Sequence, residues 1–324
     1  MKTGGKLAAA LACCIAAGAH AQTADPSRYP VRTVRVVVPF APGGPSDLPA
    51  RIVGVKLSEA WGQQVVIDNR GGAGGIVGAE IVAKSAPDGY TLVMGTTGTH
   101  GINASLYPKL SYDTIKDFAP IARIGISNYA LIAHPSLPVR NVRELLKLAK
   151  ARPGQLTWSS GGSVSQLAAE LFKRTADIDV VVVPYKGNAL AVTATMSGEV
   201  SLNFGGIAQS APLVRAGKLK ALAVSGLKRS NVMSDVPTVA ESGVPGFEAG
   251  SWYGLLAPAA TPRAIVERIN KEVVRIVQLP DVRERLAAEA FEVPIDTPAE
   301  FAAYIRADVV KWAKVVKQAG IKAE

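Results

Sequence analysis

The hydrophobic residues of this chain fall into short continuous runs that alternate with longer segments of helical period. In the run 34–38 every residue except Arg35 is valine, which is typical of a strand buried on both faces. The pattern predicts strands at residues 34–38, 64–68, 90–94, 156–159, 180–184, 200–204 and 221–225, and helices at 46–60, 75–85, 141–151, 165–175, 190–196, 209–216, 262–277, 281–290 and 298–318. Such alternation predicts an α/β fold with mostly parallel sheets flanked by helices.

Two extended apolar segments, 120–135 and 251–258, interrupt this alternation. Each is placed where the chain would cross from one domain to another, and a chain of this length usually needs more than one core. We therefore expect two lobes. Lobe 1 comprises residues 29–128 and 252–324, and lobe 2 comprises residues 129–251.

The first 21 residues have the pattern of a secretory signal peptide. Lys2 and Lys6 precede an apolar run at 7–17, and Ala19-His20-Ala21 forms a small-residue cleavage site. We expect cleavage after Ala21, export to the periplasm and no insertion in the membrane, since no later run reaches the ~18–20 apolar residues of a membrane helix.

Composition excludes several kinds of site. Both cysteines, Cys13 and Cys14, lie in the predicted signal peptide, so the mature chain has no disulfide, no thiolate metal site and no cysteine nucleophile. The net charge of +10 falls by two, to +8, when Lys2 and Lys6 are removed. The remaining basic residues are scattered over predicted helices, which argues against nucleic acid as a partner. We expect no cofactor and no metal.

The predicted loops at the carboxyl ends of the strands are rich in glycine, serine and threonine. In doubly wound sheets these loops surround the ligand. The sequence Gly43-Gly44-Pro45-Ser46-Asp47 predicts a tight turn followed by a helix capped by Ser46 or Asp47. One such loop is equally well explained by turn chemistry. Similar loops of small and polar residues recur at residues 69–75, 95–100, 159–163, 185–188 and 205–209. This repetition favours a cleft that is walled by helix N-termini and suited to an anion.

Motifs for catalysis are missing from the sequence. The glycines of 72–78 miss the dinucleotide fingerprint by one residue, since Val77 stands where its third glycine is required. The segment 161–165 ends in Ser165, where a nucleophile elbow needs glycine. His100 has no obvious partner for base catalysis and His134 is expected to be structural. The sequence thus indicates a binding protein rather than an enzyme.

Six motifs together resemble one family, the Bug receptors of tripartite tricarboxylate transporters. They are VPFAPGGPSD at 38–47, NRGGAGG at 69–75, APDGYTL at 86–92, VPYKG at 183–187, LKALAV at 219–224 and DVPT at 235–238. The resemblance implies a two-lobed, type II periplasmic-binding-protein fold that holds a small carboxylate by backbone amides and waters. It also implies membrane permease subunits as partners. The chain departs from the family at Gln166, where a histidine is frequent.

The loops and the resemblance together give a set of candidate ligand contacts. They are Phe40, Pro42, Gly43, Gly44, Ser46, Asp47, Thr96, Thr97, Thr99, His100, Ser159, Ser160, Gly161, Ser163, Tyr185, Lys186, Gly187, Gly206 and Gln209. We expect a monomer that delivers a carboxylate to a transporter. A receptor that feeds a sensor kinase is the alternative, and an exported α/β enzyme is the third possibility.

Overall fold

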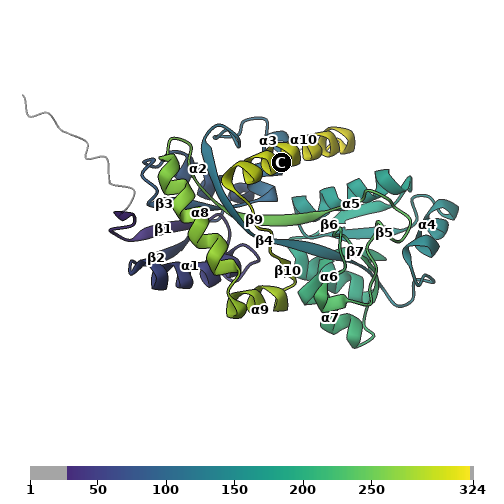
Figure 1. The fold of residues 1–324 in the computed structure, drawn as a ribbon. Coiled ribbons are helices and arrows are strands. Elements are labelled where there is room, and N and C mark those ends of the chain that lie inside the picture. The colour runs from purple at the N-terminus through teal and green to yellow at the C-terminus, as the bar shows by residue number, and fades with distance from the viewer. Residues whose placement is uncertain (1–27, 322–324) are drawn as a thin grey trace, which may run out of the picture.

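The computed structural model describes residues 28–321, and within them the chain forms two lobes joined by long strands (Figure 1). The predicted signal peptide, residues 1–21, lies outside the described residues. Among the described residues, no helix has both the length and the apolar character needed to cross a membrane.

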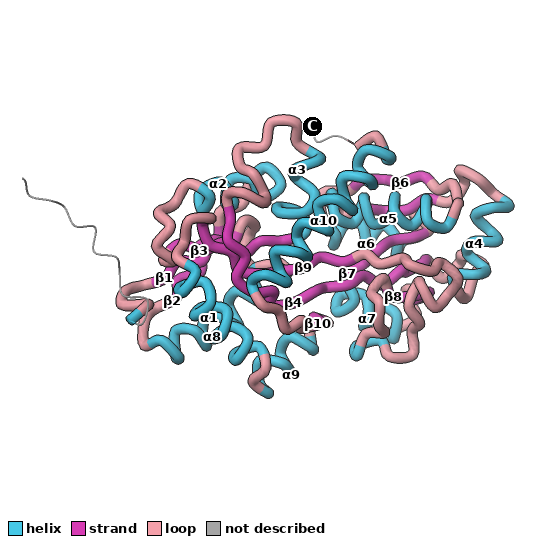
Figure 2. The backbone as a smooth tube through the Cα atoms, turned by 45° about the horizontal axis from the view of Figure 1, so that its top comes forward, coloured by secondary structure: helices cyan, strands magenta, loops and turns pink. Residues whose placement is uncertain are grey.

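Lobe 1 is built on three parallel strands, in the order β2-β1-β3. They are β1 (Val34–Val38), β2 (Val65–Asn69) and β3 (Thr91–Thr96). Helices on both faces cover them (Figure 2): α1 (Asp47–Trp61), α2 (Ile76–Ala83), α3 (Asn103–Leu106), α8 (Arg263–Val277), α9 (Pro280–Ala288) and α10 (Pro298–Ala319), with shorter helical turns η2 (Ala73–Gly75) and η3 (Thr97–Ile102).

Lobe 2 repeats the scheme around a second parallel set, in which β5 lies between β6 and β7. Its strands are β5 (Thr157–Ser160), β6 (Val181–Pro184), β7 (Leu202–Gly206) and β8 (Lys220–Val224). Its helices are α4 (Val142–Ala151), α5 (Ser163–Ala176), α6 (Asn188–Ser197) and α7 (Ile207–Arg215), with the turn η4 (Asn231–Met233).

The two extended segments of the sequence are strands that join the lobes, β4 (Phe118–Ala133) and β9 (Gly250–Pro258). β4 pairs with β9 over residues 118–128 and with β7 over residues 129–133. A third short strand, β10 (Phe291–Glu292), also pairs with β4. All these pairings are antiparallel, so the parallel part of each sheet is confined to its βα units. The lobe boundaries at residues 128 and 251 stay a prediction.

Each lobe has its own hydrophobic core. The lobe 1 core packs Leu92 and Met94 of β3 against α1 and α8. The lobe 2 core is aromatic, with Trp158 lying 4.9 Å and Phe172 lying 6.0 Å from the ring of Phe204. Burial of one such side chain stabilises a fold by about 1.5–3 kcal/mol. Because each lobe buries its own set, each lobe has its own packed support for the loops at its cavity wall.

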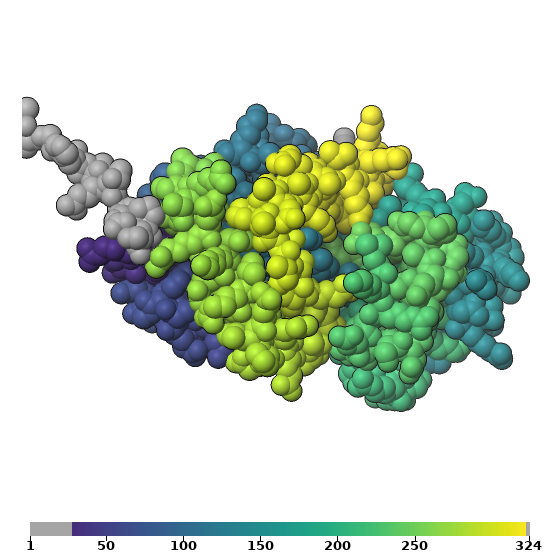
Figure 3. All heavy atoms as spheres, viewed as in Figure 1, coloured from purple at the N-terminus to yellow at the C-terminus, as the bar shows by residue number. Residues whose placement is uncertain are grey.

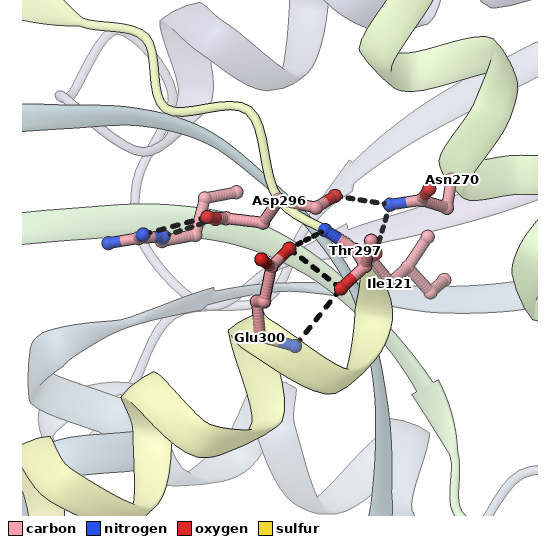
Figure 4. A network of polar contacts seen from close by, with 6 residues as sticks. Ile121, Asn270, Asp296, Thr297 and Glu300 are labelled. Atoms are coloured by element: carbon pink, nitrogen blue, oxygen red, sulfur yellow. Dashed lines mark hydrogen bonds and ion pairs between the residues drawn. The ribbon is translucent and has the colours of Figure 1, made fainter.

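The long helix α10 is anchored at its N-terminus by polar contacts (Figure 4). Thr297 and Glu300 form a reciprocal capping box, which satisfies two free amides of the first turn. Asn270 of α8 donates to the carbonyl oxygens of Ile121, at 2.8 Å, and Asp296, at 2.9 Å. These bonds tie α10 to β4 and α8, and so to the strands that join the lobes.

One segment differs in type from its prediction. Residues 95–100 were expected to be a loop at the end of a strand, but residues 95–96 belong to β3 and residues 97–100 begin the helical turn η3, which α3 continues. The cause is local, because Thr96 and Thr99 form a capping box in which each side chain bonds the other's backbone amide, at 3.2 and 3.0 Å. The predicted helices and strands elsewhere lie within a few residues of the observed ones.

Candidate ligand-binding site

A cavity of about 540 Å³ lies between the lobes, and Figure 3 shows the surface hollowed there. Both lobes and the joining strands contribute to its lining: Phe40, Gly43, Gly44, Pro45, Ser46, Leu48, Gly74, Thr96 and Gly98 from lobe 1, Gly161, Gly162, Ser163, Val164, Ser165, Asn188, Gly206, Ile207, Ala208 and Gln209 from lobe 2, and Ser127, Tyr129, Ser251, Tyr253, Glu289 and Phe291 between them. The volume suits a small organic ligand.

The lobe 1 wall is the turn that opens α1. Asp47 is buried behind this turn and accepts hydrogen bonds from the Gly43 amide at 2.9 Å, Arg51 Nε at 2.7 Å and Asn69 Nδ2 at 2.9 Å. Burial alone would raise the pKa of Asp47, but these donors outweigh it and hold that pKa below its usual value. The carboxylate therefore fixes the turn. The Asp47 and Leu48 amides at the start of α1 donate to the Gly44 carbonyl, at 3.0 and 3.2 Å, so the amides left for a ligand are those of Gly44 and Ser46.

Two details of this turn were left open by the sequence, which offered either Ser46 or Asp47 as the cap. Ser46 occupies the N-cap position, but its side chain makes no capping hydrogen bond, because Asp47 reaches back to the Gly43 amide instead. Of the two glycines, only Gly43 has a positive φ, at +79°. Gly44 is therefore needed for its small size at the cavity and not for a left-handed backbone.

The lobe 2 wall is formed by the N-termini of three helices, α5, α6 and α7. At α5, the Gly161 amide donates to Ser165 Oγ at 3.0 Å, and that hydroxyl donates to the Gly162 carbonyl at 3.0 Å. A Cβ at Gly161 would lie within 3.0 Å of the backbone of Asn188, the first residue of α6. Asn188 Nδ2 in turn lies 3.4 Å from Gln209 Oε1 of α7. The three helix ends are thus packed directly on one another.

The joining strands form the floor of the cavity. Ser127 of β4 pairs with Ser251 of β9, and alternate residues of a strand face the same side. Tyr129 and Tyr253 consequently follow the serines into the cavity lining. Phe291 of β10 packs on Tyr253, with the ring centroids 5.5 Å apart.

The charges of this cavity are unusual for an anion site. Within residues 28–321, the lining contains no lysine, arginine or histidine, and its one charged side chain is Glu289. Positive potential comes from helix ends, whose first four amides have no partner within the helix and carry about half a unit charge. The N-termini of α1, α5, α6 and α7 all reach the cavity. The arrangement can hold a carboxylate by neutral donors.

The structure separates the predicted contacts into two groups. Nine line the cavity, namely Phe40, Gly43, Gly44, Ser46, Thr96, Gly161, Ser163, Gly206 and Gln209. The other ten are outside the lining: Pro42, Asp47, Thr97, Thr99, His100, Ser159, Ser160, Tyr185, Lys186 and Gly187. Direct contact of the nine with a ligand stays a prediction.

Most residues of the second group support the walls from behind. Thr97 Oγ1 accepts from the Trp252 amide at 3.0 Å, and Ser159 Oγ bonds Thr195 Oγ1 at 2.9 Å. His100 is fully buried, its Nδ1 lies 2.8 Å from Thr99 Oγ1, and burial lowers its pKa to about 3. These residues shape the site without facing it. Tyr185 instead bonds Glu199 on the exposed surface, at 2.7 Å.

Sequence reasoning missed the floor and one corner of the cavity. Ser127, Tyr129, Ser251 and Tyr253 share a period-two pattern of hydroxyl side chains in the two crossing segments, which could have indicated a common face. Glu289 and Phe291 carry no such signal, because only the packing of α9 and β10 brings them to the cavity.

Two lobes that enclose a cavity between paired strands define the class of periplasmic solute-binding proteins. The chain belongs to the tripartite tricarboxylate transporter receptor family, whose model matches residues 49–321. Protein BugT of Bordetella pertussis is 33% identical over 320 residues, which is 98% of either chain. A protein from the tcbD-tcbE intergenic region of Pseudomonas sp. strain P51 is 35% identical and covers 89% of this chain and 86% of its own length.

Solved structures give the same class. An R. palustris protein determined with adipate is 38% identical, with a TM-score of 0.79 over 91% of this chain and 99% of its own. MatC from Rhodopseudomonas palustris with bound malate is 38% identical, with a TM-score of 0.75 over 89% and 100%. The periplasmic binding protein BugD is 32% identical, with a TM-score of 0.76 over 91% and 100%. The predicted two-lobed fold, the Bug family and a solute receptor rather than an enzyme are confirmed.

Proposed function

We propose that this protein binds a small carboxylate between its lobes and delivers it to the membrane subunits of a tripartite tricarboxylate-type transporter. The observation that carries the proposal is the cavity wall itself. Four helix N-termini from two lobes meet at one cavity whose described lining has no basic side chain. Such a wall favours an anion small enough to be surrounded by amides.

Family membership supports the transport part. The family is one of transporter receptors, and two structures 38% identical to this chain were solved with adipate and with malate. Both ligands are small aliphatic carboxylates. We infer export by the predicted signal peptide and a periplasmic location from the same membership.

The joining strands allow ligand binding to change the position of one lobe relative to the other. β4 is continuous across both lobes, so a bend near its middle would move lobe 2 against lobe 1. A ligand that contacts both walls favours the closed form by its differential affinity for it. We infer an open free state and a closed liganded state, which the permease subunits distinguish.

A thermal-shift screen with purified mature protein tests carboxylate binding. The probes are succinate, malate, glutarate, adipate, citrate and benzoate, each matched with the corresponding amide or alcohol. A ligand at 100 times its Kd adds about 2.7 kcal/mol to the free energy of unfolding, which is a readable shift. A response to the amides as strong as to the acids, or to polyamines and metals alone, would refute the proposal.

Delivery needs its own measurement. Uptake of the radiolabelled best ligand is compared in cells with the receptor gene intact, deleted, and restored with Gly44→Val, which alters the cavity wall. We expect loss of high-affinity uptake on deletion and weakened restoration by the variant. Unchanged uptake in the deletion strain would exclude the transport role while leaving carboxylate binding intact.

A further inference from the structure

One corner of the cavity has the opposite polarity to its walls. This corner is formed by Glu289, Ala290 and Phe291, where α9 ends and β10 begins. Glu289 is the C-cap of α9, so this acidic residue follows the negative end of that helix. Every other helix end in the cavity lining is an N-terminus. The cavity therefore has a positive wall and a negative corner.

Nothing in the described chain neutralises this corner. None of the ion pairs formed within residues 28–321 includes Glu289, and no basic side chain of that range lines the cavity. Phe291 and Tyr253 stand next to it as an edge-to-face pair, with an interplanar angle of 75°. Aromatic faces together with a carboxylate are the surroundings that favour an organic cation.

The corner is also held in place relative to both lobes. Phe291 belongs to the core cluster of lobe 1, whereas Ala290 belongs to a cluster of lobe 2 residues that includes Ile132 and Ile207. Ala290 has a left-handed backbone, with φ of +58°, which a non-glycine residue adopts only when its surroundings require it. Glu289 is thus an exposed residue of the cavity lining whose main chain is held by its buried neighbours Ala290 and Phe291.

We propose that the ligand of this protein is an aminocarboxylate, with its carboxylate on the helix N-termini and its ammonium group toward Glu289, Tyr253 and Phe291. This inference rests on the proposed function, because it assigns a class of carboxylate to the same cavity. The positive wall lies at the ends of β1, β5 and β7, and the negative corner lies at a different part of the lining, where α9 ends and β10 begins. The two charged groups of the ligand are therefore separated by several bonds, and a second carboxylate at the ammonium position would be repelled by Glu289.

Matched pairs of ligands test the proposal by isothermal titration calorimetry. In each pair one terminal carboxylate is exchanged for an aminomethyl group, which keeps the number of carbon atoms: glutarate with 5-aminopentanoate, and adipate with 6-aminohexanoate. We expect the wild-type protein to bind at least one aminocarboxylate about tenfold more tightly than its dicarboxylate partner. In Glu289→Gln, we expect aminocarboxylate affinity to fall about three- to tenfold, as for a partly exposed charge pair, and dicarboxylate affinity to stay or rise.

Glu284→Gln is the control, since Glu284 is exposed on the same helix and is not in the cavity lining. It removes the same charge and should change neither affinity. Tighter dicarboxylate binding by the wild type, or equal effects of Glu289→Gln on both classes, would overturn the inference while the proposed function stands. Binding of neither class would overturn the inference, and if no acid of the thermal-shift screen bound either, the proposed function would be overturned with it.

Discussion

Both walls of the cavity present helix N-termini, but different contacts hold those helix ends in place. In lobe 1, the turn before α1 is braced by a side chain, the buried carboxylate of Asp47 with its three donors. In lobe 2, the α5 turn is braced by the main chain, because Gly161 lies against the backbone of Asn188. The helix N-termini are equivalent for a ligand, yet we expect mutations to act on them differently. Lobe 1 should be sensitive to the carboxylate and lobe 2 to the glycine.

The buried polar groups behind the two walls also differ, since some are titratable and others are neutral. Behind the lobe 1 wall lie two buried titratable groups, His100 and Asp308. Behind the lobe 2 wall lie neutral groups, such as Asn203 Nδ2, which donates to the Ser159 carbonyl at 2.8 Å. Only titratable groups couple stability to pH. The comparison therefore places the buried groups that couple stability to pH behind the lobe 1 wall.

The largest effect is expected from Gly161→Ala in lobe 2. The new methyl group would lie within 3.0 Å of main-chain atoms of Gly187 and Asn188, which cannot rotate away. We expect the free energy of unfolding to fall by about 3 kcal/mol or more, with loss of binding. Denaturant unfolding and hydrogen exchange resolved along the chain measure both.

Gly206→Ala is its matched control. Gly206 also lines the cavity, but a Cβ there has its nearest neighbour at 3.8 Å and the residue has no positive φ. We expect a change within about 0.5 kcal/mol. Equal effects of the two substitutions would show that main-chain packing does not brace the lobe 2 wall.

A smaller effect is expected from Asp47→Ala in lobe 1. The substitution leaves the Gly43 amide without its acceptor and Asn69 Nδ2 with only the Phe40 carbonyl, which should free the turn, reduce stability by about 1–3 kcal/mol and weaken ligand binding. Glu267→Ala serves as the control, because its ion pair with Arg263 is exposed and should contribute less than about 1 kcal/mol. If the two variants have the same melting temperature, the buried carboxylate of Asp47 stabilises the protein no more than an exposed ion pair does.

The buried titratable groups of lobe 1 predict how the stability of the protein depends on pH. Burial raises the pKa of Asp308 to about 6, although Trp252 Nε1 donates to its carboxylate at 2.7 Å. The folded state thus holds a proton on Asp308 that the unfolded state lacks, and stability from this group is present below pH 4 and lost as pH rises toward 6. His100, with its pKa lowered to about 3, acts oppositely, because the unfolded chain gains its proton as pH falls below about 6.5.

Between pH 4 and 6 these two contributions cancel in the wild type. Asp308→Asn removes one of them, keeps an acceptor for Trp252, and should stabilise the protein at pH 7 by about 2 kcal/mol. It should also expose a loss of stability on acidification that the wild type does not show. Melting curves at half-unit steps of pH would reveal it, and parallel profiles of the two proteins would contradict the expected pKa of Asp308.

The sequence was sufficient for whatever depends on local pattern. The run of valines at β1, the two long crossing segments and the glycine turns at the ends of β1 and β5 were all predicted close to their observed positions. The sequence did not predict which side chain fixes the turn before α1, because Asp47 and Ser46 are both good caps. Asp47 is favoured by its contact with Asn69, which is far along the chain. Glu289 escaped notice for a similar reason, since its place in the cavity comes from the packing of α9 between the lobes.

The smallest effect on stability is expected from Gly44→Val in the lobe 1 wall. A Cβ at Gly44 would have its nearest neighbour, the Ala41 carbonyl oxygen, at 3.5 Å, and the backbone there has no positive φ. We therefore expect the free energy of unfolding to change by less than about 0.5 kcal/mol. Affinity should nevertheless fall about tenfold or more, since the side chain would occupy the space through which a ligand approaches the α1 amides.

Gly71→Val is the control for this last substitution. Gly71 lies near the same turn, has no positive φ and is outside the cavity lining, so affinity should be retained. Calorimetry on both variants, with small-angle scattering of the wild type with and without ligand, tests the wall and the hinge together. Unchanged affinity in Gly44→Val would remove the α1 turn from the site. An unchanged radius of gyration at saturation would mean that the ligand is held without closure, and that the transporter must recognise something other than the distance between the lobes.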